Sequence, residues 1–460
     1  MSKHIYDVAG IGFGPANIAL AVCLEEMNSP LDVCFFDTQN NPSWQHQMLL
    51  DGSDIQNNPL RDFVTPRNPR SHYSFVNYLK LKGRLFEYLN LPSHYPLRRE
   101  FASYIQWVSE HFTDLVRVGV RVEGLEWTEQ SGEQVWRLRG SDGSEAFARS
   151  VVLGTGRSAN IPAVFRPVLG DRVFHLSHYL ERLAALPPGI HRIGVVGASQ
   201  SAVEILLDLM GRFPKHEIHS IQRSFGFRQK DLSPFSDRVY FPEFVDYFYG
   251  LPSEGKRNIN RQLRGTNYSS ADADVIQALY MKLYEEKLNG KERFFFDNNT
   301  EVTSVNTTNE SVHLGLKEVN TGNLSSVDLD AVVLATGFLD LSGGPVGEKY
   351  PPLLAPFANE MQMDHSSGVL HVTRDYKVNF NSQRAPALFL NGLCEGSHGL
   401  GDAGSFSLLS IRSEVIANAL VAVLVQRDVK HQTSLPSKIA HGKESFVVPT
   451  YQEFVCSPLL

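Results

Sequence analysis

The feature that most constrains the fold is a glycine-rich turn that follows a short β-favouring segment at the start of the chain. Residues 5–9 (IYDVA) have the composition of a strand, and the turn GIGFGP begins immediately after them at Gly10. Apolar residues at helical spacing cover 16–27, and a second apolar segment at 31–36 ends at Asp37. This order predicts a βαβ unit of the kind that opens a dinucleotide-binding domain.

The turn matches the first two glycines of the G-x-G-x-x-G fingerprint and carries Pro15 at the third position. Gly10 permits a tight turn, and Gly12 allows a pyrophosphate to approach the N–H groups at the helix N-terminus. We expect Gly10, Gly12, Gly14 and Pro15 to hold the adenine end of FAD, with Asp37 on a ribose hydroxyl. An ordinary tight βα turn is the alternative that these residues alone leave open.

The same strand, small-residue turn and helix recur at 192–209, where Ser199 replaces the middle glycine of the fingerprint. Arg223 follows the next strand, at the place where an NADP site puts a cation against the ribose 2′-phosphate. A guanidinium binds phosphate through two hydrogen bonds, so Arg223 is a candidate for that role, and a solvated basic loop is the alternative. Two such units predict two nucleotide sites.

Two strand-like segments, 150–156 and 329–337, each end in Thr-Gly, as in flavoproteins whose chain passes between two nucleotide domains. The predicted fold class is therefore α/β, with two Rossmann-like dinucleotide-binding domains for FAD and NADPH and a small, mainly helical substrate region. The expected boundaries are an FAD domain at 1–186, an NADPH domain at 187–328 with a helical insertion at about 233–290, and a second FAD part with the C-terminal tail at 329–460. The polar segment 426–460 has no assigned role.

Composition and charge exclude several classes of partner. The chain has 43 Lys+Arg and 50 Asp+Glu, a formal net charge of −7, which argues against a nucleic-acid partner. Its four cysteines lack the CxxC spacing of a zinc site, its start lacks the layout of a signal peptide, and its longest apolar run, 416–425, is too short to span a membrane. We therefore expect a cytoplasmic protein with no bound metal and no membrane partner.

Motifs along most of the chain resemble those of the flavin-dependent N-hydroxylating monooxygenases that oxidise the side-chain amine of ornithine or lysine in siderophore biosynthesis. Their order and spacing carry the resemblance more than any one of them does. The motifs are GIGFGPAN from residue 10, SWQHQMLL from 43, RNPRSHYSFVNYL from 67, PLRREFASYIQWV from 96, GASQSAVE from 197, SPFSDRVYFPEF from 233, GTNYSSADAD from 265, ATGF from 335 and SHGLGDAGSFSLLSIRSE from 397.

The resemblance implies an enzyme in which NADPH reduces FAD, O2 adds at the flavin C4a carbon, and the hydroperoxide gives its distal oxygen to an unprotonated primary amine. It also implies a homo-oligomer, commonly a dimer or a tetramer. By position in the motifs it assigns flavin contacts to Trp44, His46, Met48 and Gln56, and NADPH contacts to Gly197, Gln200 and Ser201. Thr266 and Asn267 match a stretch that contacts nicotinamide ribose and substrate, and Ser407 lines the flavin and substrate site. No residue acts as an acid or base, and Gln56 and Asn267 are expected to position the reactants.

Two departures from the family pattern fall on the expected substrate site. Arg61 replaces the lysine that grips the substrate α-carboxylate, and Asp237 replaces an asparagine. A carboxylate at 237 would repel the substrate's own carboxylate and favour a cation or an N–H donor. We hypothesise that the substrate is a decarboxylated amine, such as histamine, putrescine or cadaverine, bound by Arg61, Asp237, Asn267 and Ser407.

Other interpretations remain open from the sequence. L-Ornithine or L-lysine is the second candidate substrate, and Arg61 and Asp237 would in that case form a structural ion pair. A Baeyer–Villiger or sulfur-oxidising flavin monooxygenase, or a flavoprotein without turnover, is more remote, because the fingerprint FxGxxxHxxxW of the former is missing around His175 and His178. Asp402, in a lengthened loop, is expected to be an exposed, solvated carboxylate.

Overall fold

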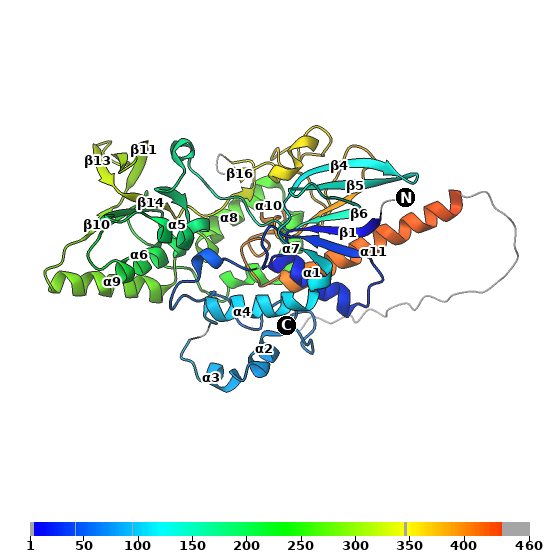
Figure 1. Ribbon diagram of the computed structural model, residues 1–460, viewed down its shortest axis with the longest axis horizontal. Helices are drawn as coiled ribbons and strands as arrows, with labels where there is room; N and C mark the ends of the chain where they lie inside the picture. The colour runs from blue at the N-terminus through cyan, green and yellow to red at the C-terminus, as the bar shows by residue number, and fades with distance from the viewer. Residues whose placement is uncertain (1–3, 42, 94, 345–346, 435–460) are drawn as a thin grey trace, which may run out of the picture.

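The computed structural model describes residues 4–41, 43–93, 95–344 and 347–434 (Figure 1). A seven-stranded sheet, on the right of Figure 1, has the order β3-β2-β1-β6-β5-β4, and β17 also pairs with β6. Its strands are β1 (Ile5–Ile11), β2 (Val33–Phe36), β3 (Val116–Arg117), β4 (Val122–Gln130), β5 (Glu133–Gly140), β6 (Glu145–Leu153) and β17 (Ala387–Leu390). Because β17 pairs in parallel with β6, the C-terminal part of the chain completes the sheet that the N-terminal part begins.

A second, five-stranded sheet lies on the left of Figure 1 and is parallel throughout, in the order β10-β9-β8-β14-β7. Its strands are β7 (Val173–His175), β8 (Arg192–Val196), β9 (Glu217–Ile221), β10 (Phe294–Asp297) and β14 (Ala331–Leu334). A three-stranded antiparallel sheet, β11 (Thr300–Thr307), β12 (Val312–Glu318) and β13 (Leu324–Leu329), packs on one face of it. The remaining pair is β15 (Asp340–Leu341) with β16 (Gly347–Glu348).

Helices cover the sheets through the faces that carry their apolar residues. The α-helices are α1 (Pro15–Glu26), α2 (Phe75–Leu81), α3 (Leu85–Leu89), α4 (Arg98–Ser109), α5 (Tyr179–Ala185), α6 (Gln200–Arg212), α7 (Pro242–Gly250), α8 (Ser253–Asn267), α9 (Ala273–Leu288), α10 (Glu395–His398) and α11 (Leu409–Ser434). Short 3-10 helices are η1 (His46–Met48), η2 (Glu110–Leu115), η3 (Ala163–Val168), η4 (Leu176–His178), η5 (Ser236–Tyr240) and η6 (Pro352–Phe357). α1 and α11 share a core with the first sheet, while α6 and α9 share one with the second.

The two predicted strand, turn and helix units are confirmed, as is the α/β class. The first is β1, α1 and β2, and the second is β8, α6 and β9. The segment 233–290 is helical earlier than its sequence pattern indicated, since α7 and α8 precede the helix expected from Ala273 onward. The three domain boundaries remain predictions.

The two Thr-Gly segments lie side by side where the chain passes between the sheets. One follows β6 and the other follows β14, and an antiparallel bridge joins Ala159 to Phe338. Asn160 Nδ2 donates to the Thr336 carbonyl at 3.0 Å, and Thr336 Oγ1 donates to the Asn160 carbonyl at 2.6 Å. Both connections between the sheets therefore run through one place in the molecule.

Within the described ranges, no helix is long and apolar enough to cross a membrane. Over the same ranges, His, Cys, Asp and Glu side chains form no group of three or more that could hold a metal ion. Cys23, Cys34 and Cys394 are buried free thiols, and Cys456 lies outside the described residues.

Candidate active site

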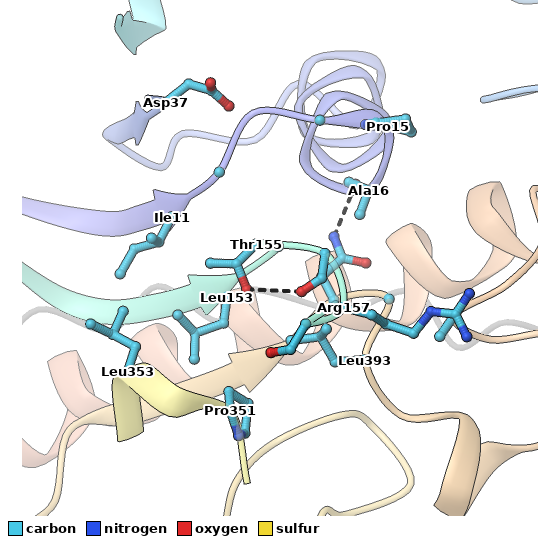
Figure 2. Close-up of a pocket in the computed structure, with 18 of the residues that line it drawn as sticks. Ile11, Pro15, Ala16, Asp37, Leu153, Thr155, Arg157, Pro351, Leu353 and Leu393 are labelled. Atoms are coloured by element: carbon cyan, nitrogen blue, oxygen red, sulfur yellow. Dashed lines mark hydrogen bonds between the residues drawn. The ribbon is translucent and has the colours of Figure 1, made fainter. Parts of the chain in front are cut away.

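A cavity of about 660 Å³ opens where the glycine turn, the end of β2, the first Thr-Gly segment and the loop before α11 meet. The turn between Ile11 and Pro15 runs between Asp37 on one side and Thr155 on the other (Figure 2). The predicted residues Gly12, Gly14, Pro15, Asp37 and Trp44 line this cavity. The turn that is predicted to bind the first nucleotide therefore opens onto a cavity at the N-terminus of α1.

The three glycines of the turn differ in their surroundings. A Cβ on Gly10 would lie 2.1 Å from the Phe35 ring, so this glycine makes room for the core. Gly12 has a φ of +84° and a Cβ there would lie 2.6 Å from the Gly154 carbonyl oxygen, whereas nothing lies within 4 Å of a Cβ on Gly14. Gly12 thus packs on the first Thr-Gly segment while it lines the cavity, the open position is Gly14, and the contact of Gly12 with a pyrophosphate stays a prediction.

Gly14 is also the N-cap of α1, and no side chain caps its first N–H groups. Uncapped N–H groups at a helix N-terminus are suited to binding an anion such as a diphosphate. Asp37 accepts hydrogen bonds from the backbone N–H of Phe13 at 2.6 Å and of Gln39 at 2.7 Å. A carboxylate has lone pairs for further donors, so Asp37 keeps capacity for a ribose hydroxyl.

The flavin-side residues separate into two groups. The Trp44 ring stands edge-on to Phe406 with centroids 5.0 Å apart, and both residues line the cavity. His46 is exposed, and Met48 is buried in the core of the second sheet, with its carbonyl bound by Arg98 Nη1 at 2.9 Å. Neither His46 nor Met48 is among the residues that line the cavity.

Three predicted contact residues carry a buried polar atom without a partner. These atoms are Gln56 Nε2, Thr266 Oγ1 and Asn267 Nδ2. Gln56 also has a φ of +52°, which few non-glycine residues adopt. Because an unpaired buried donor costs about 1–3 kcal/mol, such atoms fit positions that a bound molecule completes. The residues present therefore fit a bound flavin and nicotinamide.

Two predicted substrate residues are in contact. Arg61 Nη1 donates to Ser407 Oγ at 3.2 Å, and the guanidinium carbon lies 5.6 Å from the centroid of the Tyr240 ring. Ser407 Oγ in turn donates to Asn57 Oδ1 at 3.3 Å. Asp237 is half-buried in the first turn of η5.

In the part of the chain that the structure describes, no ion pair joins Arg61 to Asp237. Both charges nonetheless act on one group: burial and then the Asp237 charge raise the pKa of Tyr240, and Arg61 lowers it. The two side chains therefore share a neighbourhood, and a direct structural ion pair between them is not formed.

The second glycine turn resembles the first in the way its glycine packs. Gly197 has a φ of +148°, and a Cβ there would lie 2.3 Å from the Ala335 carbonyl oxygen, at the second Thr-Gly segment. Ser199 takes the N-cap position of α6 without a side-chain capping bond. Gly12 on the first segment and Gly197 on the second thus correspond, and Ser199 corresponds to Gly14 as the N-cap of its helix, so the expectation that Ser199 replaces the middle glycine is wrong.

The predicted NADPH residues differ in their surroundings. The Gln200 side chain is held within the protein, because its Nε2 donates to Glu204 Oε1 at 2.9 Å and its Oε1 accepts from the Asp272 N–H at 2.8 Å. Ser201 is partly buried in the first turn of α6. Arg223 is exposed just after β9.

Sequence reasoning missed Gln222, the residue directly after β9. Its side chain is buried with neither amide atom paired, and Ser224 Oγ nearby is also buried and unpaired. Gln222 directly follows β9, just as Asp37 directly follows β2. This position, after the second strand of a strand, turn and helix unit, was the sequence signal that could have identified Gln222 as a candidate site residue.

A buried polar cluster beside the cavity was also missed. The Tyr268 hydroxyl donates to Glu395 Oε2 at 2.5 Å, and Arg157, which lines the cavity, donates to the Tyr268 oxygen and to Asp340, each at 2.8 Å. Burial is the main cause that raises the pKa of Glu395 to about 8; the Asp340 charge adds to it and Arg157 opposes it. At neutral pH this carboxyl is therefore mostly protonated.

Asp402 is not the exposed carboxylate that the sequence suggested. It is buried, accepts from the Cys394 N–H at 2.7 Å, and pairs with Arg412 Nη1 at 3.1 Å. Arg412 Nε also donates to Asn391 Oδ1 at 2.9 Å, and Asn391 Nδ2 reaches the Ala16 carbonyl at 2.9 Å. The buried Asp402 carboxylate requires a charged partner, which Arg412 supplies. Through Arg412 and Asn391 the lengthened loop is thus linked to α1.

Comparisons with known proteins identify the relatives of this chain. The family model of L-lysine 6-monooxygenase/L-ornithine 5-monooxygenase matches residues 4–340. An L-ornithine N(5)-monooxygenase of Pseudomonas aeruginosa is 36% identical over 428 residues, which are 90% of this chain and 94% of that protein.

Solved structures of N-hydroxylating monooxygenases are also similar to this chain. An ornithine N-hydroxylase from Kutzneria sp. 744, with reduced FAD, NADP+ and L-ornithine, superimposes with a TM-score of 0.84 at 29% identity, over 92% of this chain and 100% of that one. A FAD-bound cadaverine monooxygenase of Erwinia amylovora gives 0.77 at 26% identity, over 98% and 100% of the two chains.

The prediction of FAD and NADPH as cofactors, with O2 as the second substrate, is confirmed at the level of the family. The match lends no support to a Baeyer–Villiger or non-catalytic flavoprotein. With the family model covering more than two thirds of its length, the chain belongs to the L-lysine 6-monooxygenase/L-ornithine 5-monooxygenase family and is an N-hydroxylating flavin monooxygenase.

Proposed function

We propose that this enzyme N-hydroxylates a primary amine that has no carboxylate at its far end, such as histamine, putrescine or cadaverine, in siderophore biosynthesis. The observation that carries the proposal is Asp237, a half-buried carboxylate without an ion-pair partner among the described residues, in the neighbourhood of Arg61. An unpaired carboxylate attracts a cation and repels a carboxylate. L-Ornithine or L-lysine is the second candidate, since members of the family act on them.

The state of Arg61 supports the same substrate class. Its guanidinium is already hydrogen-bonded to Ser407 and lies against the Tyr240 ring. A substrate carboxylate would have to share this guanidinium with Ser407. A lysine in the family position presents a compact ammonium, whereas the planar guanidinium here would place a carboxylate differently.

The wider charge balance also favours a cation. Burial raises the pKa of Tyr95, the charges of Asp272, Asp237 and Asp54 raise it further, and Arg61 lowers it. Lys230 Nζ lies 3.9 Å from Asp272 Oδ1 and offsets one of these carboxylates. The carboxylates that remain would stabilise the distal ammonium of a diamine.

The roles of the chain's own residues follow from this arrangement. Bound FAD supplies the oxygen-activating chemistry. The α1 N-terminus and Asp37 would hold its diphosphate and ribose, and Gln56, Thr266 and Asn267 would place the flavin, nicotinamide and amine relative to one another. Trp44 packed on Phe406 helps to exclude water. Asp237 would hold the far end of the substrate, so that the neutral amine at the other end faces the flavin.

The test is a substrate panel. Purified enzyme with FAD and NADPH is given ornithine, lysine, putrescine, cadaverine or histamine, and hydroxylamine formed per NADPH oxidised is measured. We expect the highest ratio with one of the three amines that lack a carboxylate. Efficient hydroxylation of ornithine alone would sink the substrate assignment, and NADPH oxidation without hydroxylamine from any amine would overturn the N-hydroxylase activity itself.

Two variants connect the result to the residues. Asp237→Asn should raise KM for the preferred amine by about 10-fold or more, the value of one charge-assisted hydrogen bond, and should not raise KM for ornithine. Arg61→Lys is the matched change, and it should improve ornithine relative to the preferred amine. Equal KM changes for all substrates in both variants would contradict the roles given to these charges.

Two further expectations accompany this function. The family resemblance implies self-association as a dimer or tetramer, and the composition suggests a cytoplasmic enzyme.

A further inference from the structure

The polar cluster around Tyr268 joins the end of α8 to both connections between the sheets. Tyr268 is the C-cap of α8, and its phenol donates to Glu395 Oε2, at the start of α10, at 2.5 Å. The phenol oxygen also accepts from Arg157 Nη1, just after the first Thr-Gly segment, at 2.8 Å. Arg157 Nη1 in turn donates to Asp340, just after the second Thr-Gly segment, at 2.8 Å. Four distant segments thus meet here, and α8 and α10 lie between the two sheets in Figure 1.

Gly404 brings this cluster to the cavity. A Cβ on Gly404, which lines the cavity, would lie 2.7 Å from the Tyr268 hydroxyl oxygen and 2.8 Å from Asn267 Nδ2. Both polar atoms therefore converge on one point of the cavity wall. Asn267 Nδ2 is buried without a partner, as a donor is that a bound molecule completes. Because Asn267 and Tyr268 are adjacent in the chain, the contacts that fix Tyr268 also fix where this amide points.

The backbone at the end of α8 requires such contacts. Ser269, directly after Tyr268, has a φ of +57°, which few non-glycine residues adopt. A conformation of this kind persists only where the surrounding structure holds it in place. The body of α8 gives little support, because Thr266 is the buried residue of this helix. The hydrogen bonds of the Tyr268 phenol supply part of that support.

We propose that Glu395 is a positioning residue for the hydroxylation: by holding the Tyr268 phenol it fixes the end of α8, and with it the Asn267 amide that meets the reactants. Glu395 is not among the residues that line the cavity, so it acts through Tyr268. The inference rests on the role of Asn267 in the proposed function, and it adds the residues that aim the Asn267 amide.

The surroundings of Glu395 favour its neutral form. Burial is the main cause that raises the pKa of Glu395 to about 8, and the charges of Asp340 and Asp402 add to it. The Arg157 charge and the hydrogen bond from Tyr268 lower this pKa. The charged and titratable groups around Glu395 are Arg157 and Asp340 at the two connections, Tyr268 of α8, Asp402 of the loop before α11, and Tyr240 of η5.

Ionisation of Glu395 would disturb the hold on Tyr268. A carboxylate attracts the Arg157 guanidinium, whose Nη1 lies 3.9 Å from Glu395 Oε2. Nη1 has two N–H groups, and both are used, on Tyr268 and on Asp340. A new bond from Nη1 to Glu395 therefore takes one of them away. We expect the neutral carboxyl to hold the phenol and to leave Arg157 in place.

The test measures hydroxylamine formed per NADPH oxidised, with the amine that gives the wild-type enzyme its highest yield. Tyr268→Phe and Glu395→Ala should each lower this yield by about 10-fold, since a misplacement of about 1 Å can cost about 100-fold in rate. The double variant should fall no further, because the two side chains act as one unit. Tyr73→Phe is the matched control, because it removes a phenol that donates to Glu25 at 2.9 Å and is not at the cavity; it should leave the yield unchanged.

A neutral replacement separates positioning from folding. Glu395→Gln keeps an oxygen acceptor for the phenol and carries no charge at any pH, so it should keep the wild-type yield at pH 7. The neutral fraction of a group with a pKa of about 8 falls about 10-fold between pH 7 and pH 9. The yield of the wild type divided by that of Glu395→Gln should therefore fall by up to about 10-fold over this range. The ratio cancels the effect of pH on the amine itself.

Three results would overturn the inference. They are a wild-type yield in Tyr268→Phe, a yield ratio that does not change with pH, and a loss in Glu395→Gln as large as in Glu395→Ala. Tyr268→Phe removes one oxygen atom and keeps the ring, so it decides the question even if Glu395→Ala does not fold. Failure of the proposed function is a separate result, because the wild-type enzyme itself would then give hydroxylamine with no amine or with ornithine alone.

Discussion

The buried ion pair between Arg98 and Glu204 joins the two halves of the molecule, and removing only one of its charges should strongly destabilise the protein. Arg98, at the start of α4, meets Glu204 of α6 through two hydrogen bonds of 2.8 Å each. The side chains are 7% and 4% exposed, so neither charge is solvated. Arg98 also donates to the carbonyls of Met48 at 2.9 Å and Asp54 at 3.0 Å.

Replacing Arg98 with methionine keeps the volume and removes the charge. The Glu204 carboxylate is then buried without its partner, which costs about 3–5 kcal/mol. Two carbonyls also lose a donor, at about 1 kcal/mol each. Since a domain is stable by only about 5–15 kcal/mol, Arg98→Met should leave the protein on the edge of unfolding at room temperature.

A double-mutant cycle separates the charge from the rest. Most of the cost should vanish in Arg98→Met/Glu204→Leu, because no buried charge remains and an apolar pair fills the space. Urea unfolding followed by tryptophan fluorescence, with FAD bound throughout, gives the midpoints. The reasoning is refuted if the two single substitutions are additive within about 0.5 kcal/mol, since an unpaired buried charge predicts strong coupling.

Other predictions follow from single residues of the site. Gly12→Ala should lower the Tm of the FAD-free protein, because the positive φ of Gly12 and the Gly154 carbonyl leave no room for a methyl group. Gly14→Ala should keep that Tm and lower the amount of FAD bound per chain. Equal Tm values for the two variants would contradict the roles assigned to the glycines. Glu395 has a pKa of about 8 in the folded chain and near 4.5 when unfolded, so between these pH values the folded state holds an extra proton. The free energy of unfolding should therefore fall as pH rises through that window. Glu395→Gln should flatten this slope in urea midpoints taken from pH 5 to pH 8. His398 should have the opposite effect, because burial lowers its pKa from 6.5 to about 4 and the free energy of unfolding should therefore fall as pH drops through that range. If His398→Gln leaves the dependence of the urea midpoint on pH unchanged, this role of His398 is contradicted.

Local patterns predicted the parts of the site that depend on neighbouring residues. The turn at Gly12 and the position of Asp37 after β2 follow from strand, turn and helix order, and both lie at the cavity as expected. The resemblance brought Arg61 and Ser407 together, although they are 346 positions apart. Motif order was informative because each motif sits at the end of a strand or at the start of a helix.

The remaining parts depend on contacts that no local pattern encodes. Arg98 and Glu204 are 106 positions apart, and either one alone is an ordinary charged residue of a helix. Asp402 was expected to be an exposed carboxylate in a lengthened loop, yet Arg412 one helix turn into α11 pairs with it. Met48 lies in a flavin-matching motif, but its side chain is in the core of the second sheet, so a motif places the segment without fixing which way a side chain points.

The paired Thr-Gly segments determine how the two sheets can move. Because the chain enters and leaves the second sheet through segments held together by the Asn160 and Thr336 hydrogen bonds, both covalent connections between the sheets lie on one line. Two bodies joined along one line can turn about it but cannot slide apart. A rotation of the sheets about this line would keep both connections, with Gly12 and Gly197 each packed on one of the two segments, but it would have to break the Arg98–Glu204 ion pair, which also joins the two halves.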